Sequence, residues 1–375
     1  WEEWKLELKK TPGEKTLKSV QLLEPSDLNL SAYCHIYFSD FISSSFWLDL
    51  HVYPMHASLF FFLNDILKQT RFSVVFLMLS GSDTGFGHAL AKYLDSLGFV
   101  VFAGVLHKDG PGAEELRKTC SRRLSVLQLD ITNATQVKEA YLKVSEKVQN
   151  TGLWGVVNNA GILGFPAGGE LLPMSMYRQC MEVNFFGAVE VSKTFLPLLR
   201  KSKGRLVNVS SMAGGIPLPR CAAYGASKAA LSMFSGVMRQ ELSKWGVKVA
   251  AIHPSGFRTG TSNVWEKQEK EMMENLPADT RQDYGEDYLL GLKDYLLRMP
   301  AYCEADLSPV LSAILHALLA KRPQGVYTPG KGAYMFPWVF CYLPLWFYDF
   351  FVSKMMNTES VPRVLRASEA KSKNL

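Results

Sequence analysis

Three side chains of types used in acid–base chemistry lie near one another in the sequence: Ser211, Tyr224 and Lys228. Residues 221–234 contain no proline and many small side chains, which predicts a closely packed helix. A spacing of four residues places the Tyr224 phenol and the Lys228 ammonium on one helix face, roughly 5–6 Å apart at Cβ. A cation there favours the phenolate, so we expect the pKa of Tyr224 to fall below about 10. The alternative is an exposed pair without function, because this spacing also arises by chance.

A glycine-rich loop follows an apolar segment of strand length at residues 72–79. After Ser80, the glycines Gly81, Gly85 and Gly87 are spaced G-x-x-x-G-x-G, and residues 89–97 have the pattern of a helix. A strand, a glycine turn and a helix N-terminus together present backbone N–H groups and the helix dipole to a pyrophosphate. The alternative is an ordinary strand-to-helix turn, since a lone glycine pattern is weakly specific.

Three further apolar runs have the length of strands: residues 100–105, 124–129 and 153–157. Each run is nearly continuous, and helical stretches separate them, as expected for parallel strands that are buried on both faces. The second run leads into Asp130 and the third into Asn158. This pattern predicts an α/β fold with a parallel sheet.

The ordered motifs resemble those of the short-chain dehydrogenases/reductases. They comprise the glycine loop, residues 158–161, Asn184, Ser211, the pair Tyr224 and Lys228, and residues 254–256. The resemblance covers about residues 74–330 and implies a Rossmann-type doubly wound parallel sheet, with a helical substrate lid at about residues 259–321. Residues 101–105, 183–187 and 204–212 are similar to the membrane-bound steroid and retinol dehydrogenases of this family.

The resemblance also implies a role for each site residue. Tyr224 would be the acid or base on the substrate hydroxyl, and Lys228 would stabilise its phenolate and bind the nicotinamide ribose. Ser211 would hold the substrate oxygen, with Ser210 as its rival, and Asn184 would anchor a water that leads from the lysine to solvent. The other implied contacts are to the dinucleotide: Ser80, Gly81, Gly85, Phe86 and Gly87 in the loop, Asp130 at the adenine, Asn158 and Ala160 at the adenosine ribose, and Pro254 to Thr259 at the nicotinamide.

Two positions depart from the family pattern. Ser80 stands where threonine is usual, which keeps a hydroxyl. Ser255 follows Pro254 where glycine is usual, and Gly256 comes one position later. The second departure leaves the contacts to the nicotinamide carboxamide open.

The choice between NAD and NADP depends on basic residues near the adenosine ribose. An enzyme that selects the 2′-phosphate usually supplies Arg or Lys in the glycine loop or after the second strand. The loop has Asp83 and Thr84, while Lys108 and Asp109 after the second strand argue in opposite directions. We predict NAD as the cofactor, with NADP as the alternative.

Composition excludes other classes of function. The 375 residues are 47% hydrophobic, which is ample for a core, and the net charge of +6 forms no long basic block. Because no nucleic-acid motif accompanies this charge, we expect no nucleic-acid partner. The six cysteines show no C-x-x-C and no Cys/His metal spacing, so we predict reduced thiols and no metal site.

Two segments flank the predicted catalytic domain of residues 74–332. The longest uncharged run in residues 1–73 has about 15 residues, whereas a membrane span needs about 20. We assign this segment no fold and expect that it is not the family's own amino-terminal anchor. Residues 333–375 hold an aromatic extension, interrupted by Pro337 and Pro344, and a basic tail. The extension predicts seating at a membrane interface, and the alternatives are an aromatic lid on the substrate pocket or a homodimer interface.

The lid is rich in Leu, Met, Tyr and Trp, which suits a large apolar ligand. With the resemblance, this implies NAD-dependent oxidation of a secondary alcohol on a steroid, the 17β-hydroxyl of estradiol or testosterone, at the endoplasmic reticulum membrane. One alternative is a related hydroxysteroid or retinol dehydrogenase. Another is a catalytically silent NAD-binding scaffold, against which the intact set of Asn184, Ser211, Tyr224 and Lys228 argues.

Overall fold

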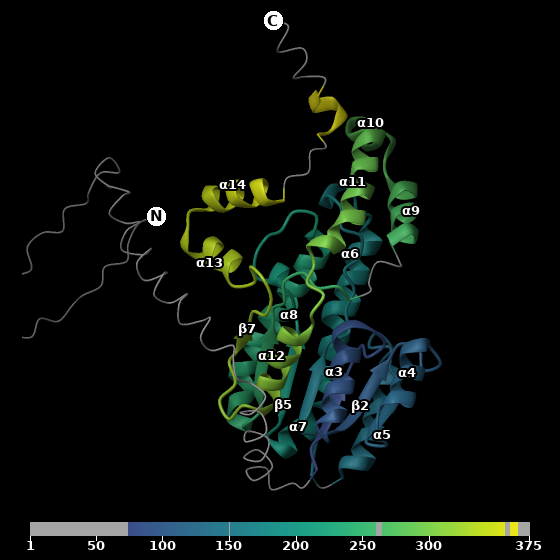
Figure 1. Ribbon diagram of the computed structural model, residues 1–375, viewed down its shortest axis with the longest axis vertical. Helices are drawn as coiled ribbons and strands as arrows, with labels where there is room; N and C mark the ends of the chain where they lie inside the picture. The colour runs from purple at the N-terminus through teal and green to yellow at the C-terminus, as the bar shows by residue number, and fades with distance from the viewer. Residues whose placement is uncertain (1–73, 150, 260–264, 357–360, 367–375) are drawn as a thin grey trace, which may run out of the picture. The chain divides into compact units, whose positions relative to one another are not determined.

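The computed structural model describes residues 74–149, 151–259, 265–356 and 361–366 (Figure 1). All of them belong to one compact unit, Ile66–Leu375. The predicted segment 1–73, residues 260–264 of the lid and most of the basic tail lie outside the described residues, and the predicted domain boundaries stay predictions.

Seven parallel strands form one sheet in the order β3-β2-β1-β4-β5-β6-β7. The strands are β1 (Phe76–Leu79), β2 (Val100–Val105), β3 (Leu124–Gln128), β4 (Gly155–Asn158), β5 (Arg205–Val209), β6 (Lys248–Ile252) and β7 (Val326–Tyr327). The strand order reverses at β1, which pairs with β2 on one side and β4 on the other. Such a switch point opens a crevice at the carboxyl ends of the strands, where ligands bind in α/β sheets. The predicted doubly wound sheet is therefore confirmed.

Helices cover both faces of the sheet (Figure 1). They are α3 (Gly85–Ser96), α4 (Pro111–Thr119), α5 (Ala134–Val148), α7 (Ala188–Ser202), α8 (Ala222–Glu241) and α12 (Ser308–Leu319), while α6 (Met174–Met181) packs on α8. Helices α5 and α7 contact each other and the sheet, and so do α3 and α12. Because side chains alternate along a strand, each apolar strand supplies both layers of the core.

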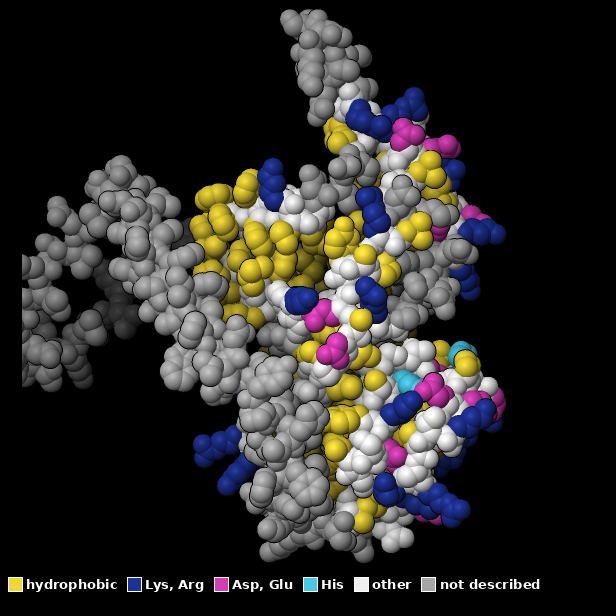
Figure 2. All heavy atoms as spheres, viewed as in Figure 1, with side chains coloured by type: hydrophobic (Ala, Val, Ile, Leu, Met, Phe, Trp, Pro, Cys, Tyr) yellow, Lys and Arg dark blue, Asp and Glu magenta, His cyan; other side chains and the backbone are white. Residues whose placement is uncertain are grey.

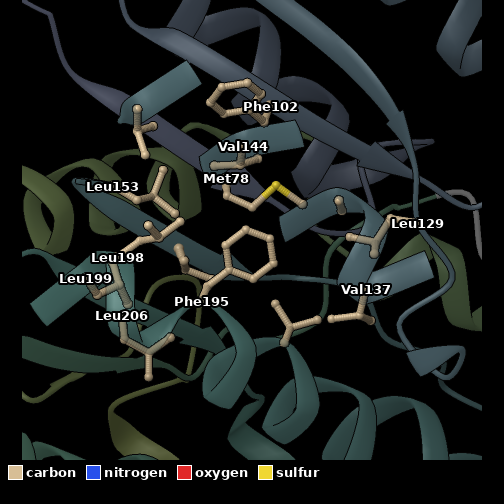
Figure 3. Close-up of a cluster of buried hydrophobic side chains, with 14 of the residues drawn as sticks. Met78, Phe102, Leu129, Val137, Val144, Leu153, Phe195, Leu198, Leu199 and Leu206 are labelled. Atoms are coloured by element: carbon tan, nitrogen blue, oxygen red, sulfur yellow. The ribbon is translucent and has the colours of Figure 1, made fainter. Parts of the chain in front are cut away.

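One core cluster lies between the sheet and helices α5 and α7 (Figure 3). Met78 of β1 and Phe102 of β2 meet Val144 of α5 and Phe195 of α7 there. Phe195 has no exposed surface, so replacing it with alanine should cost about 3–5 kcal/mol of stability. This core fixes the strands whose carboxyl ends carry the site.

Three lid helices are inserted between β6 and α12: α9 (Trp265–Asn275), α10 (Ala278–Tyr284) and α11 (Glu286–Arg298). This confirms the helices predicted for this region. Their apolar faces pack on the segment around α6 and on the start of α8, through the cluster that includes Met272, Leu292, Leu296, Met176 and Ala223. The lid therefore has a small core of its own beside the site.

The aromatic extension forms two helices, α13 (Met335–Tyr342) and α14 (Leu345–Met355). Pro344 separates them as predicted, but Pro337 lies in the first turn of α13, where a missing N–H does not interrupt the helix. Tyr348 and Val352 pack on Ile216, and the Tyr348 hydroxyl donates to the Pro217 carbonyl at 2.5 Å. Among the described residues, no helix combines the length and the apolar character that a membrane crossing requires.

Candidate active site

The glycine loop between β1 and α3 has the backbone shape that its sequence predicts. Gly81 and Gly85 have φ angles of +66° and +58°, which residues with side chains rarely adopt. A Cβ on Gly87 would clash with the Gly81 carbonyl oxygen and would lie 2.5 Å from Asn159 Nδ2. Gly81 thus shapes the turn, and Gly87 lets α3 approach it closely. This leaves a cradle at the α3 N-terminus that fits a pyrophosphate.

One predicted contact residue, Ser80, holds the loop and does not line the cavity. Ser80 is buried, and its Oγ accepts hydrogen bonds from the backbone N of Asn159 and Ala160 at 3.1 and 3.2 Å. This hydroxyl joins the end of β1 to the segment after β4. Ser80 therefore positions the loop through the hydroxyl that threonine usually supplies, and its predicted direct contact with the cofactor stays a prediction.

The Asn158 side chain points into the protein, so the structure does not bring it to the cavity, and its predicted contact with the adenosine ribose stays a prediction. The side chain is buried, and its Nδ2 donates to Ser192 Oγ and Asn208 Oδ1, both at 2.8 Å. The neighbouring Asn159 lines the cavity instead and donates to the Gly81 carbonyl oxygen at 2.9 Å. Side chains alternate in direction along a strand, and this alternation continues one residue past the end of β4. It could therefore have identified Asn159 as the residue that faces the cavity.

A cavity of about 1500 Å³ opens at the carboxyl ends of the strands. It is lined by most of the predicted cofactor residues, namely Gly81, Gly85, Phe86, Asp130, Ala160, Pro254 and Thr259, and by the predicted catalytic residues Ser211, Tyr224 and Lys228. This volume exceeds the roughly 300–1,000 Å³ of a usual ligand pocket. The cavity therefore has room for a dinucleotide and a second ligand.

Ser211 and Tyr224 lie together in this cavity. Ser211 caps the short 3₁₀ helix η5 (Met212–Gly214), where its Oγ accepts from Ala213 N at 3.2 Å. Burial raises the pKa of Tyr224 to about 12, while a hydrogen bond with the Ser211 side chain acts in the opposite direction. The expected lowering of the Tyr224 pKa is therefore wrong, because the cost of burying a phenolate exceeds the effect of its polar neighbours.

The Lys228 ammonium makes a hydrogen bond to the backbone. Its Nζ donates to the Val209 carbonyl at 2.8 Å and lies 5.9 Å from the centroid of the Tyr224 ring. Burial lowers the pKa of Lys228 to about 8. The helix spacing thus places the two residues on one face as predicted, with the ammonium beside the ring and bonded to the end of β5.

The two adjacent serines have different partners. Ser210 Oγ donates to the Lys228 carbonyl at 2.9 Å and shares a hydrogen bond with Ser232 Oγ at 2.8 Å. Its hydroxyl therefore joins β5 to α8, whereas that of Ser211 reaches the phenol of Tyr224. This geometry favours Ser211 over its rival as the group that meets a substrate oxygen.

Asn184 lies in the π-helical turn η4 (Glu182–Gly187), which continues into α7. Its Oδ1 accepts from Ile162 N at 2.8 Å, and its Nδ2 donates to the Ile162 carbonyl at 2.9 Å. A Cβ on Gly161 would lie 3.0 Å from both Asn184 Oδ1 and Lys228 Nζ, so the two groups flank this glycine. Asn184 is close to the lysine as expected, and π-helical turns are frequent at functional sites. Its role in holding a water stays a prediction.

The departure at Ser255 is accommodated by a glycine on another segment. Gly330 has a φ of +100°, and a Cβ there would clash with Ser255 Oγ. The serine hydroxyl therefore occupies the space that Gly330 leaves beside it. Pro254 and Gly256 still line the cavity, so the extra side chain does not close the predicted nicotinamide end.

The end of the cavity near β2 carries acidic groups. The Asp83 carboxylate lines it and accepts from Leu106 N at 2.8 Å and His107 N at 3.2 Å. Asp130 accepts from Thr132 N and Thr132 Oγ1 at 2.9 and 2.7 Å through a single oxygen, Oδ1. Among the described lining residues the basic ones are His107, Lys228 and Arg298, and Lys108 is not one of them.

The opposite end of the cavity is apolar and aromatic. The lid contributes Tyr295 and Met299, and the loop before α8 contributes Leu218. The carboxyl-terminal helices add Phe336 and Met355. The alternative of an aromatic lid on the pocket thus agrees with part of the extension, although the sequence pattern did not identify which of its residues reach the cavity.

The comparisons with known proteins agree with this arrangement. A family model described as short chain dehydrogenase matches residues 76–270. The chain is 59% identical over 301 residues to 17-beta-hydroxysteroid dehydrogenase type 2 of Homo sapiens, covering 79% of this chain and 78% of that protein. It is 44% identical over 296 residues to 11-beta-hydroxysteroid dehydrogenase type 2 of Bos taurus, covering 78% and 73%.

A solved structure shows the same fold. It is a short chain dehydrogenase from Burkholderia cenocepacia in complex with NADP, with a TM-score of 0.56 and 22% sequence identity over 74% of this chain and 96% of that one. The family match extends over the glycine loop, Ser211, Tyr224 and Lys228, whose geometry is described above. The chain therefore belongs to the short-chain dehydrogenase family of oxidoreductases.

Proposed function

We propose that this protein oxidises the 17β-hydroxyl of a steroid such as estradiol or testosterone to the ketone, with NAD as the hydride acceptor. The observation that carries the proposal is one continuous cavity, in which the hydrogen-bonded pair Ser211 and Tyr224 stands between a glycine-loop end and an apolar end. The 59% identity to 17-beta-hydroxysteroid dehydrogenase type 2 supports this substrate class.

The geometry supports a role for each of these residues. Ser211 donates to the carbinol oxygen and orients it, while Tyr224 removes its proton as the carbonyl forms. The nicotinamide supplies the site that accepts the hydride. Lys228 holds positive charge beside the phenol and helps to orient the cofactor, and Asn184 keeps the loop after β4 in place next to it. No metal is part of this proposal.

The preference for NAD over NADP is supported by the acidic end of the cavity. A 2′-phosphate there would meet the carboxylates of Asp83 and Asp130, which also line this wall. Because Lys108 does not line the cavity, the basic residue that favoured NADP in the sequence is not in position to bind it. Replacing Asp83 should therefore narrow the preference for NAD, although it also removes two hydrogen bonds to the loop after β2.

We also propose that the protein associates with the endoplasmic reticulum membrane through helices α13 and α14. Apolar side chains cover this part of the surface in Figure 2. Tyr342, Leu345, Trp346 and Phe350 are each more than half exposed, whereas Trp338, Phe340 and Phe347 pack against the buried cluster. Exposed rings beside an apolar cavity suit the headgroup layer of a bilayer.

A homodimer is proposed on a separate surface. Met233 and Val237 lie one turn apart on α8 and are 71% and 42% exposed, and Phe186 of η4 is 51% exposed. Burial of such a stripe against a second copy would remove it from water. Sedimentation of the wild type and of Met233→Asp tests this, and a monomeric wild type contradicts it.

The experiment that tests the function uses the full chain with NAD or NADP and a panel of alcohols. The panel contains 17β-, 11β- and 3β-hydroxysteroids and a retinol, because a relative with another regiochemistry is 44% identical. Product formation is followed by the absorbance of the reduced nicotinamide. We expect the highest kcat/KM with estradiol or testosterone and NAD. A preference for the 11β-hydroxyl or for retinol would favour the alternative, and cofactor binding without turnover would favour a silent scaffold.

A further inference from the structure

The loop between Ser211 and α8 contains an arginine in a backbone conformation that disfavours it. Arg220 has a φ of +64°, in the left-handed region that is strained for residues with a side chain. It directly precedes Cys221, the N-cap of the helix that carries Tyr224. Such conformations persist where the surrounding contacts hold them, and they concentrate at functional sites.

The Arg220 side chain contacts the substrate lid. Its guanidinium carbon lies 4.2 Å from the ring centroid of Tyr295 in α11, within the roughly 6 Å of a cation–π interaction. Burial raises the pKa of Tyr295, and the charge and hydrogen bond of Arg220 act in the opposite direction. Because Tyr295 lines the cavity, this contact fixes one of its walls.

The same loop is held from another side by the carboxyl-terminal helices. Ile216 is buried against Val339 and Tyr348, and the Pro217 carbonyl accepts from the Tyr348 hydroxyl. The loop thus joins the lid, the carboxyl-terminal helices and the start of α8. A change in its contact with the lid should move the substrate end of the cavity and leave the sheet in place.

We propose that Arg220 is a positioning residue that holds lid helix α11, through Tyr295, against the start of α8 and so closes the cavity over a bound apolar alcohol. The inference rests on the proposed function, because it concerns the substrate of the same site. Without this contact Tyr295 has no fixed position at the cavity wall, so substrate binding weakens. The Ser211–Tyr224 pair and the glycine loop do not depend on it. KM should therefore change more than kcat, and NAD affinity should not change.

A double-mutant cycle tests the contact, with a matched control elsewhere in the molecule. The control is Arg200→Ala, because Arg200 makes a comparable contact with Trp245, at 5.0 Å, in the last turn of α7 near the amino end of β5. We expect Arg220→Ala and Tyr295→Leu each to raise the KM for the steroid about tenfold. The KM of the double variant should be close to that of either single variant. The control should leave KM unchanged. Full additivity in the double variant would overturn the proposal.

Hydrogen exchange of α11, measured on the full chain with NAD added, gives a second readout that needs no steroid. We expect faster exchange of α11 in Arg220→Ala and wild-type exchange in Arg200→Ala. Arg220→Lys keeps the charge but not the planar stacking group. The exchange rate of α11 in this variant should therefore lie between those in Arg220→Ala and the wild type. Wild-type exchange of α11 in both Arg220 variants would overturn the proposal. This measurement decides the role of Arg220 even if the wild type oxidises no steroid, a result that would refute the proposed substrate alone.

Discussion

The two ends of the cavity are built from different parts of the chain. The cofactor end is shaped by backbone, as at Gly81, where a Cβ would lie 2.6 Å from Ala160 Cα. The substrate end is lined by side chains of the lid and of the carboxyl-terminal helices, such as Tyr295 and Phe336. Backbone geometry tolerates little change, whereas a wall of side chains can be altered without disturbing the sheet. Cofactor affinity and substrate affinity should therefore vary independently, with Ser211 and Tyr224 affecting turnover alone.

The largest expected effect is at the junction of the two ends. Tyr224→Phe removes the hydroxyl that exchanges the proton and keeps the ring, so kcat should fall by at least about three powers of ten. NAD affinity, measured by titration calorimetry, should stay within about threefold of the wild type. A variant that keeps a tenth of the wild-type turnover would show that Tyr224 is not the proton-transfer group.

The next effect separates the two serines. Ser211→Ala should lower kcat by roughly two to three powers of ten, because a donor to the substrate oxygen is lost. Ser210→Ala should act mainly on stability, since its hydroxyl bonds to the Lys228 carbonyl and to Ser232. Steady-state kinetics and thermal unfolding of both variants distinguish them. A large loss of turnover at Ser210 with little at Ser211 would reverse the assignment.

The rate should depend on pH through Tyr224. Because its pKa is raised to about 12, the phenol is protonated at neutral pH, and the base form needed for oxidation grows about tenfold per pH unit. Single-turnover oxidation should therefore accelerate from pH 6 to about pH 8, where Lys228 has lost its proton in about half of the molecules. Ketone reduction uses the protonated phenol as the acid, so its rate should not rise over the same pH range. A pH-independent rate of oxidation would contradict this account.

A glycine pair tests whether the cofactor end depends on backbone shape. Gly87→Ala places a methyl group against the Gly81 carbonyl, so NAD affinity should fall about tenfold to hundredfold. Gly236→Ala in α8 is the control, because nothing lies within 4 Å of the added carbon. It should keep NAD affinity and stabilise the helix by about 0.5–1 kcal/mol. Equal NAD affinity in both variants would show that the loop is not the cofactor cradle.

The smallest effect concerns the outer surface of the substrate end. Changing Tyr342, Leu345, Trp346 and Phe350 together to serine should weaken binding to vesicles containing anionic lipid about tenfold. NAD affinity should be unchanged, because these side chains lie outside the cofactor end. The control changes Leu142 and Val326, which are 56% and 49% exposed, to serine. Unchanged flotation of the aromatic variant would exclude α13 and α14 as the membrane contact.

The sequence predicted the features that depend on local spacing. The glycine loop and the shared face of Tyr224 and Lys228 follow from residue type and helical spacing, and the helical lid was implied by the family resemblance. The inward direction of the Asn158 side chain was not predicted, because it depends on where β4 ends. The direction of the Tyr224 pKa was missed because it depends on burial by elements distant in the chain. The Arg220–Tyr295 contact was not predictable for the same reason, since it joins the loop before α8 to helix α11, which is distant in the chain.

In the proposed reaction, a hydride leaves the carbinol carbon of the steroid for a nicotinamide that is bound next to Tyr224. The most direct measurement uses estradiol with deuterium on that carbon, together with NAD, and follows the label by mass spectrometry. We expect the deuterium to appear in the reduced nicotinamide with the wild type and to be absent with Tyr224→Phe, although both proteins bind NAD equally. Ketone formation without label in the nicotinamide, or equal transfer by Tyr224→Phe, would contradict the account.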